Sequence, residues 1–320
     1  MATYKGIQGY SVKVLSSDPS PTASVEGELW YNSTAAKFKI AVSGAGAWAA
    51  ATPLNTARAY LSASNIGTQT AALVVGGTSS APTEVYNGST WSEETDPNTP
   101  RSKAGGIGTS TLLTLAAGDN VSPPPAAKTV TEIWNGSTWT EVADINSARY
   151  NFGEAGTSPA SLIFGGQPGA GTSNAVELWN GTSWAEQNNL NTSAFENAGA
   201  GTSTAALSFG GRTTDENESW NGTSWTEVND LNTAREDLGG SGTQTAALAY
   251  GGTPGAMAVT ELWDGTSWTE VADLGTARFT FQGIGPSTAA ICAGGTVPPA
   301  SLLVEEWSGA PLSVKTVTVS

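Results

Sequence analysis

Short apolar runs separated by glycine-rich turns recur along the chain, and no stretch has the apolar spacing of a useful amphipathic helix. Residues 245–250 (TAALAY) form an apolar run of strand length, and residues 259–263 (VTELW) alternate like a half-buried strand. Residues 267–271 (SWTEV) predict a returning strand, and residues 234–242 (AREDLGGSG) predict a first strand weakened by glycines. One such unit therefore predicts four antiparallel strands, and the whole chain predicts an all-β fold.

One tryptophan position marks the repeat of this unit. It is occupied by Trp48, Trp91, Trp139, Trp184, Trp225 and Trp268, with gaps of 43, 48, 45, 41 and 43 residues. A period of 40–50 residues with strand content is typical of a propeller or solenoid. With this spacing, the sequence contains six first strands and six second strands, and each second strand ends at a glycine. It therefore predicts a six-bladed β-propeller with four strands per blade.

A second aromatic position lies immediately before a turn, and the turn leads to the repeat tryptophan. It is occupied by Tyr86, Trp134, Trp179, Trp220, Trp263 and Trp307. The Asn-Gly or Asp-Gly pair that follows, as at Asp264-Gly265, predicts a type I′ hairpin, with Ser308-Gly309 as a weaker sixth case. We expect the paired rings to fill the wedge between adjacent blades, where large flat side chains bury much apolar area. Exposed aromatic ladders that bind sugar are the alternative.

The two ends of the array predict how the propeller closes. Trp48 has the register of a fourth strand, but no complete blade precedes it. The last unit has its third strand at 302–307 (LLVEEW) and then Leu312 in place of the tryptophan. We therefore expect residues 45–50 to be the outer strand of the sixth blade, because closure removes both exposed edges. Residues 311–317 (PLSVKTV) are the competing candidate.

Composition excludes several kinds of function. The net charge of -15 opposes binding to nucleic acid or to an anionic membrane. The absence of histidine excludes Ser-His-Asp and Cys-His nucleophiles, and Cys292, the one cysteine, occupies a slot for a buried apolar residue. We therefore expect no metal, no cofactor and no disulfide. No run of 18 apolar residues occurs and residues 1–14 do not resemble a secretory signal, so we expect no membrane insertion and no secretion.

Arginines open the first strand of five units, ten residues after the repeat tryptophan, and Ala194 takes this position in the remaining unit. They are Arg58, Arg101, Arg149, Arg235 and Arg278. One interpretation places them around a mouth of the central channel, as a site for an anion or a carboxylated sugar. The other pairs each with a repeat carboxylate or with carbonyls of the neighbouring blade. Both remain open at this point.

The loops between second and third strands share a face with these arginines and differ most between units. They span residues 78–82, 119–128, 167–174, 212–215, 253–258 and 296–301. Variable loops on a rigid scaffold are the usual place for recognition. Asn120, Gln167 and Arg212 are therefore candidate binding residues, with neutral drift as the alternative. The acids Glu141, Glu186, Glu227 and Glu270 repeat with the scaffold, which makes each a poor candidate for a unique catalytic acid.

The whole array resembles the kelch repeat over roughly residues 45–310. In that family an arginine opens a blade, an apolar strand ends in Gly-Gly, and an aromatic and a tryptophan follow. Here those marks are Arg235, Gly251-Gly252, Trp263 and Trp268. The chain departs from the family at the first aromatic, where the usual tyrosine survives only as Tyr86. The resemblance implies a propeller, and the lack of histidine speaks against the copper oxidase chemistry that some kelch propellers support.

The segment 27–40 (GELWYNSTAAKFKI), followed by 46–48 (GAW), resembles the N-terminal region of structural and tail-associated proteins of marine bacteriophages of the cyanophage type. The resemblance implies a virion protein without enzymatic activity, made in the host cytoplasm. Residues 1–44 would anchor it to other virion proteins, residues 45–310 would present a propeller face to a host surface glycan or another virion protein, and residues 311–320 would be a tail or strand. A bacterial carbohydrate-binding or adhesion module is the alternative. A carboxylate enzyme is a third.

Overall fold

The chain forms two compact units. The structure, a computed structural model, describes residues 12–19, 28–43, 46–78, 82–120, 126–169, 171–212, 214–309 and 312–317. The first unit comprises Met1–Gly46 and Gly309–Ser320, and the second comprises Ala47–Ser308. The division places the C-terminal strand with the N-terminal segment. All the named elements are strands, and no helix among the described residues is long and apolar enough to cross a membrane.

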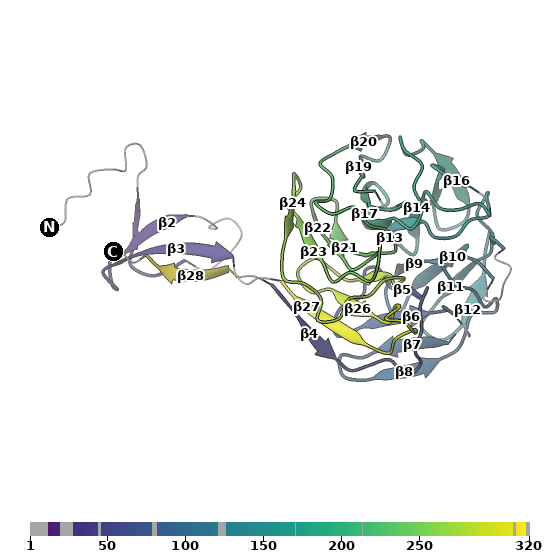
Figure 1. Cartoon of the computed structure of the whole chain (residues 1–320), viewed down its shortest axis with the longest axis horizontal. Helices are drawn as coiled ribbons and strands as arrows, with labels where there is room; N and C mark the ends of the chain where they lie inside the picture. Colours follow the sequence, from purple (N-terminus) through teal and green to yellow (C-terminus); the bar gives the residue numbers. More distant parts are fainter. Residues whose placement is uncertain are drawn as a thin grey trace. The chain divides into compact units, whose positions relative to one another are not determined.

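The second unit is a β-propeller. Its described residues form six antiparallel sheets of four strands (Figure 1). The first strands, which lie toward the middle of the unit, are β5 (Ser62–Ala63), β9 (Gly105–Gly108), β13 (Gly153–Thr157), β17 (Ala198–Thr202), β21 (Gly239–Thr243) and β25 (Gly283–Ile284). The second strands are β6 (Ala72–Val75), β10 (Leu113–Ala116), β14 (Ala160–Phe164), β18 (Ala205–Phe209), β22 (Ala246–Tyr250) and β26 (Ile291–Ala293).

The third and fourth strands complete each sheet toward its outer edge. The third strands are β7 (Thr83–Tyr86), β11 (Thr131–Trp134), β15 (Val176–Trp179), β19 (Asn217–Trp220), β23 (Thr260–Trp263) and β27 (Val304–Ser308). The fourth strands are β8 (Trp91–Glu94), β12 (Trp139–Glu141), β16 (Trp184–Gln187), β20 (Trp225–Glu227), β24 (Trp268–Glu270) and β4 (Ala47–Ala51). Five of the sheets are continuous in sequence, and the sixth joins strands from both ends of the unit.

The sixth sheet takes its outer strand from the N-terminal side. β4 pairs antiparallel with β27, and Trp48 lies opposite Trp307 in the register that places Trp91 opposite Tyr86 in the first sheet. The Trp48 indole donates a hydrogen bond to Thr260 Oγ1 of the preceding sheet (3.1 Å), as the Trp184 indole does to Thr131 Oγ1 (3.2 Å). Trp48 therefore makes the contacts of a fourth-strand tryptophan. The competing segment pairs elsewhere, because β28 (Leu312–Thr316) lies beside β3 (Lys37–Ser43).

The first unit contains one small sheet built from both ends of the chain. Its strand order is β1 (Lys13–Leu15), β2 (Leu29–Asn32), β3 and β28, with β1 and β2 parallel. Trp30 is 1% exposed, and its indole donates to Asp18 Oδ1 (3.1 Å), which also accepts from Asn32 (2.6 Å). The tryptophan outside the repeat thus supplies the core of this sheet.

The aromatic pairs lie between neighbouring sheets of the propeller. Six hydrophobic clusters each join residues of two adjacent sheets, and each contains one of the six aromatic pairs. The ring centroids within a pair are 4.8–5.5 Å apart. Phe209 of one sheet lies 5.1 Å from Trp268 of the next, and Tyr250 lies 4.8 Å from Trp48. The rings therefore fill the wedges between sheets, as the sequence predicts, and are not exposed ladders.

Two local predictions differ from the structure. The strand predicted at 234–242 begins at Gly239, so Arg235 precedes it. The Asn-Gly turns are not type I′, because only the glycine has a positive φ, as at Gly88 (90°). The turn is a four-residue loop between Tyr86 and Trp91 in which Asn87 Oδ1 accepts the backbone N–H groups of Ser89 and Thr90, each at 2.9 Å. An asparagine that bonds the backbone two and three residues onward makes a positive φ at the first position unnecessary.

We expect Trp48→Ala and Trp268→Ala to lower the melting temperature by similar amounts. Each substitution removes a large ring from a wedge between sheets, which costs roughly 3–5 kcal/mol when the ring is fully buried. Trp48 is partly buried, so its effect belongs at the lower end of that range. Thermal unfolding followed by circular dichroism makes the comparison. If Trp48→Ala leaves the melting temperature unchanged while Trp268→Ala lowers it, the role of β4 is contradicted.

Candidate functional site

The five repeat arginines are enclosed by the sheets. Each of their side chains is at most 1% exposed, and each forms an ion pair with a glutamate of the third strand in its own sheet. The pairs are Arg58–Glu84, Arg101–Glu132, Arg149–Glu177, Arg235–Glu261 and Arg278–Glu305. The structure therefore corrects the interpretation that placed these arginines around an open channel mouth. They offer no exposed surface to an anion or a carboxylated sugar. Each is instead paired with a repeat carboxylate, as the other interpretation expected.

The glutamate partners also hold the loop that leads into each sheet, here called the entry loop. Glu84 accepts the backbone N–H groups of Asn55 (2.7 Å) and Thr56 (3.1 Å). A third-strand glutamate accepts the first of these two N–H groups in all six sheets, at 2.6–2.9 Å. These glutamates precede the first aromatic of each pair by two residues, a signal present in the sequence. The repeated acids that the sequence analysis considered as catalytic candidates, such as Glu141 and Glu270, lie on the fourth strand and are exposed.

The fourth sheet lacks the cation but keeps the carboxylate. Ala194 replaces the arginine, yet Glu218 is only 5% exposed and accepts from the backbone of Asn191 (2.9 Å) and Thr192 (3.0 Å). The Asn191 side chain donates to the same carboxylate (2.8 Å). The entry loop therefore keeps its geometry without the guanidinium. The hydrogen bonds to the loop, rather than the ion pair, are the part of this arrangement that never varies.

Two residues beyond the arginine position, every repeat has a residue in the left-handed conformation. These residues, here called the central ring, are Tyr60, Lys103, Asn151, Glu196, Asp237 and Thr280, with φ between 53° and 61°. Six backbone hydrogen bonds of 2.8–3.1 Å connect them one to the next, and the last, from Tyr60 N–H to the Thr280 carbonyl, returns to the start. A non-glycine residue seldom adopts such a φ, and clusters of such residues are typical of functional sites. The side chain differs in all six repeats.

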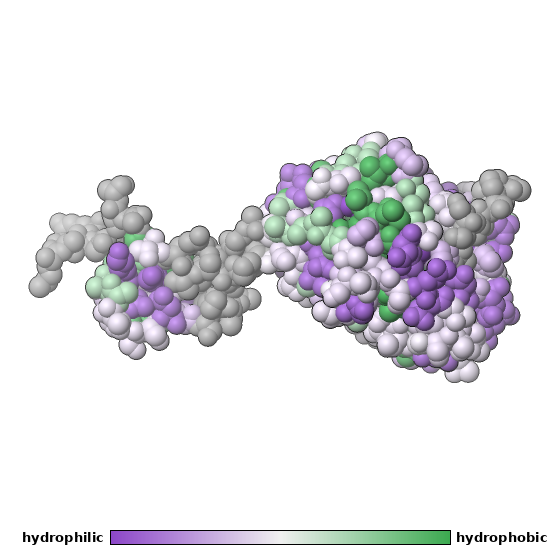
Figure 2. Space-filling view, turned by 90° about the horizontal axis from the view of Figure 1, so that it is seen from below, coloured by the Kyte–Doolittle hydropathy of each residue, from purple (hydrophilic) through white to green (hydrophobic). Residues whose placement is uncertain are grey.

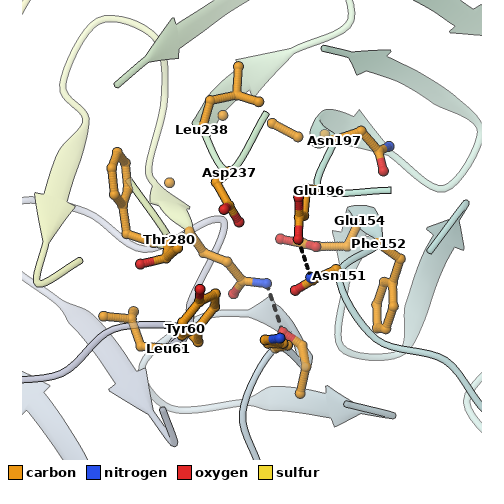
Figure 3. Close-up of a pocket in the computed structure, with 18 residues that line it drawn as sticks. Tyr60, Leu61, Asn151, Phe152, Glu154, Glu196, Asn197, Asp237, Leu238 and Thr280 are labelled. Atoms are coloured by element: carbon orange, nitrogen blue, oxygen red, sulfur yellow. Dashed lines mark hydrogen bonds between the residues drawn. The ribbon is translucent and has the colours of Figure 1, made fainter. Parts of the chain in front are cut away.

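The central ring surrounds a cavity of about 60 Å³ in the middle of the propeller (Figure 3). All six ring residues line it, together with residues of the first strands, among them Glu154 on β13. Figure 3 shows the side chains of Glu154, Glu196 and Asp237 turned toward the middle of the ring. Asn151 Nδ2 donates to Glu196 Oε1 (2.7 Å). Three carboxyl groups and one amino group, that of Lys103, therefore share one small space.

The lysine of the central ring is directed toward other partners. Its Nζ lies 3.9 Å from Asp119 Oδ2, 4.7 Å from the ring centroid of Tyr60 and 5.1 Å from that of Tyr150. Within the described residues, no cation lies within 4.0 Å of a carboxyl oxygen of Glu154, Glu196 or Asp237. The cavity therefore has an excess of acidic groups.

The three carboxyl groups of the cavity resist ionisation. Burial raises the pKa of Glu154 to about 8. Burial, and then the nearby charges of Glu196 and Glu236, raise the pKa of Asp237 to about 8, although Lys103 opposes the shift. Burial and Glu236 raise the pKa of Glu196 to about 7, against the effects of Lys103 and Asn151. Raised pKa values of this kind, inside a cavity, mark a candidate functional site.

Asn120, Gln167 and Arg212, the loop residues proposed from sequence, are not among the residues that line this cavity. Gln167 Oε1 accepts from Asn151 Nδ2 at 3.5 Å, and Arg212 Nη1 donates to Thr172 Oγ1 at 3.5 Å. Asn120 is partly buried and follows Asp119, the partner of Lys103. Parts of four of the six variable loops, including residues 121–125, lie outside the described residues. Cys292 is fully buried in β26, and burial raises the pKa of its thiol to about 12.

Comparisons with known proteins extend to the fold alone. No family model matches the chain, and no curated protein sequence matches it. Among solved structures, the one titled "Structure of YjhT" superposes with a TM-score of 0.63 at 10% sequence identity. The match covers 84% of this chain and 97% of that one. At this identity the likeness supports the propeller fold and carries no information about the chemistry of the cavity.

We expect Glu261→Gln to destabilise the protein more than Glu218→Gln does. Both substitutions disturb the hydrogen bonds to an entry loop, but only the first leaves a buried guanidinium, that of Arg235, without its counter-charge. Breaking a buried ion pair costs roughly 3–5 kcal/mol, whereas a lost hydrogen bond costs about 1–3 kcal/mol. Urea unfolding followed by tryptophan fluorescence measures the difference. Equal effects would mean that the ion pair adds nothing to the loop hydrogen bonds.

We expect the melting temperature to fall as the pH rises from 6 to 9. The pKa values of Glu154, Glu196 and Asp237 are higher in the folded protein than their ordinary values of 4.5 for glutamate and 3.8 for aspartate. Up to about pH 8 the folded state therefore binds more protons than the unfolded chain, so stability falls as the pH rises toward the folded pKa values of about 7–8 and levels off above them.

The triple variant Glu154→Gln, Glu196→Gln, Asp237→Asn removes the titrating groups, so its melting temperature should depend less on pH in this window. Asp264→Asn, which removes a carboxylate from a surface turn, is the matched control and should behave as the unmodified protein does. A pH dependence that survives in the triple variant would show that the cavity carboxyls are not its source.

Proposed function

We propose that this protein is a non-catalytic binding module built on a closed, six-bladed propeller of the kelch type. Two observations support closure: the pairing of β4 with β27, and the backbone hydrogen bonds that pass through all six residues of the central ring. The repeated arginine, the glycine pair that ends most second strands and the two aromatic positions support the kelch type. Their structural roles, namely a buried ion pair, close backbone contacts and filled wedges, explain why they recur.

The observation that carries the binding role is the contrast between scaffold and centre. The aromatic pairs and the third-strand glutamates repeat in every sheet, whereas the central ring has six different side chains. Structural demands cannot explain this difference, because all six residues have the same backbone conformation and the same hydrogen bonds. Varied side chains around a cavity on a uniform scaffold are suited to recognition.

The separate first unit supports display of the propeller on a virus particle. Its sheet contains the segment that resembles marine bacteriophage structural proteins, and strands from both chain ends contribute to it. In this proposal the first unit binds other virion proteins, and the propeller contacts a host surface glycan or another virion protein. On the side of the propeller that Figure 2 shows, hydrophilic residues lie beside a smaller hydrophobic area. The acidic net charge argues against nucleic acid as that partner.

The same features fit a second setting, a bacterial carbohydrate-binding or adhesion module. A third candidate is an enzyme that uses acid–base chemistry, which the raised pKa values of Glu154, Glu196 and Asp237 favour, because a general acid or base works best when its pKa is near the operating pH. Turnover of a glycoside that is lost in Glu154→Gln would replace the binding proposal with this one.

We expect the protein to be found in purified virus particles by mass spectrometry. It should remain after density-gradient purification and salt washing, in a constant ratio to the major structural proteins. A chain from which the first unit has been deleted should be made by the host but be absent from particles. Absence of the full chain from particles would contradict the virion proposal and leave the bacterial module in its place.

A further inference from the structure

The outer strand of the sixth sheet differs in charge from the outer strands of the other five. In those five sheets the fourth strand has an exposed glutamate directly opposite the buried glutamate of the third strand, as Glu141 lies opposite Glu132. The exposed glutamates are Glu93, Glu141, Glu186, Glu227 and Glu270. In the sixth sheet the residue opposite Glu305 is Ala50, and β4, with the sequence AWAAA, contains no charged residue.

The buried arginines do not explain this difference. If the exposed glutamates were present as counter-charges for the arginines, the two would occur in the same sheets. The fourth sheet has Glu227, although Ala194 replaces its arginine. The sixth sheet has Ala50, although Arg278 is present and paired. The exposed glutamate therefore has a role that belongs to the outer strand itself.

A charge on an edge strand opposes pairing with another edge. The unpaired backbone N–H and C=O groups of an edge bind any strand that approaches, and charged side chains prevent this. Two copies of this chain that met at glutamate-bearing edges would bring like charges together, which is destabilising. Both edge strands of the sheet in the first unit also carry a charge, Lys13 on β1 and Lys315 on β28. Among these edge strands and the outer strands of the propeller, all in the described part of the chain, β4 alone has none.

The strand β4 also exposes more of itself than the other outer strands do. Figure 1 shows it at the outside of the propeller beside β27. It has five residues, whereas the other outer strands have three or four. Ala47, Ala49 and Ala50 are exposed, and their methyl groups shield little of the backbone. The other five repeat tryptophans are 5–7% exposed, but Trp48 is only partly buried. This edge therefore combines accessible backbone groups with apolar surface.

We propose that β4 pairs antiparallel with β4 of a second copy of this chain, so that the two sixth sheets join into one. An antiparallel pair of identical strands has twofold symmetry, so the contact is satisfied by two copies and forms a dimer. With Ala49 opposite its own equivalent, Trp48 lies opposite Ala50 of the second copy, and a large ring meets a small side chain. The proposal goes beyond the binding role proposed above, because it concerns the outer edge and depends neither on the cavity nor on the virion.

The charge of the propeller makes this contact depend on salt. Residues 47–308 contain 8 Lys and Arg residues against 25 Asp and Glu residues, which gives a net charge of −17. Five of those eight cations are the buried arginines, so two copies meet through acidic surfaces. Exposed charges are screened beyond about 10 Å at 0.1 M salt and beyond about 3 Å at 1 M. Dimerisation should therefore strengthen as salt is added, whereas contact with a basic partner would weaken.

Sedimentation equilibrium of the full chain, in about 0.1 M and about 1 M sodium chloride, tests the proposal. A pair of five-residue strands buries less area than the roughly 1,200–2,000 Å² of a standard interface, so we expect a weak dimer, visible at concentrations up to about 500 µM. Ala50→Glu introduces the glutamate that the other five sheets have, and it should weaken dimerisation by at least about tenfold. Ala185→Glu makes the same change at an exposed position of β16 and should leave dimerisation unchanged.

Two further measurements separate the contact from folding. Ala50→Glu should keep the melting temperature of the unmodified protein, since five sheets already have a glutamate at this position. Amide hydrogen exchange of the unmodified protein should slow in β4 on going from a dilute to a concentrated sample. A monomer at every concentration, a dimer that dissociates as salt is added, or assemblies larger than a dimer would overturn the proposal. Equal effects of the two substitutions, or unchanged exchange in β4, would contradict the assigned edge.

Discussion

The hydrogen bonds that the entry loop donates to a buried third-strand glutamate are the interaction on which the rest of the propeller depends. They recur in all six sheets, including the fourth, where Glu218 has no arginine. The loop that they fix brings the chain from the outer edge of one sheet to the middle of the next. Four residues after the second N–H group, the chain reaches the central ring with its positive φ, as from Thr56 to Tyr60.

This arrangement separates the residues that hold the fold from those that give the centre its chemistry. The wedges between sheets are filled by aromatic pairs, and the arginine–glutamate pairs are buried within sheets. Backbone hydrogen bonds connect all six residues of the central ring whatever their side chains, so the side chains are free to differ. Two of them in succession, Glu196 and Asp237, together with Glu154 of β13, make one side of the cavity acidic. The repeat thus provides a fixed frame with six variable positions.

Much of the fold follows from the sequence because the aromatic residues combine large buried area with a fixed spacing. Trp48 pointed to the pairing of the two ends, and the structure places it opposite Trp307. The turn type was wrong, because the asparagine side chain of Asn87 replaces a strained backbone. The site could not be predicted in the same way. Repetition drew attention to arginines such as Arg235, and a charged residue at a repeated position was as compatible with an exposed ring as with a buried pair.

The central ring escaped prediction for a physical reason. Its members share a backbone conformation and no side-chain property, so no pattern of residue types marks Tyr60 and Thr280 as equivalents. Glu154 gave no signal either, since one acid in a glycine-rich strand is unremarkable until its burial is known. The sequence did contain one usable signal, which is the third-strand glutamate two residues before the first aromatic of each pair. That signal locates the entry loop, and with it the position of the ring.

The most direct test of the central claim is a carboxyl-carbon NMR titration of the protein labelled at glutamate and aspartate. The central claim is that Glu154, Glu196 and Asp237 line the cavity with no cation of the described residues within 4.0 Å of their carboxyl oxygens. It predicts two carboxyls, Glu154 and Asp237, with pKa values near 8 and a third, Glu196, near 7. If all three groups titrate below pH 5, the account is contradicted.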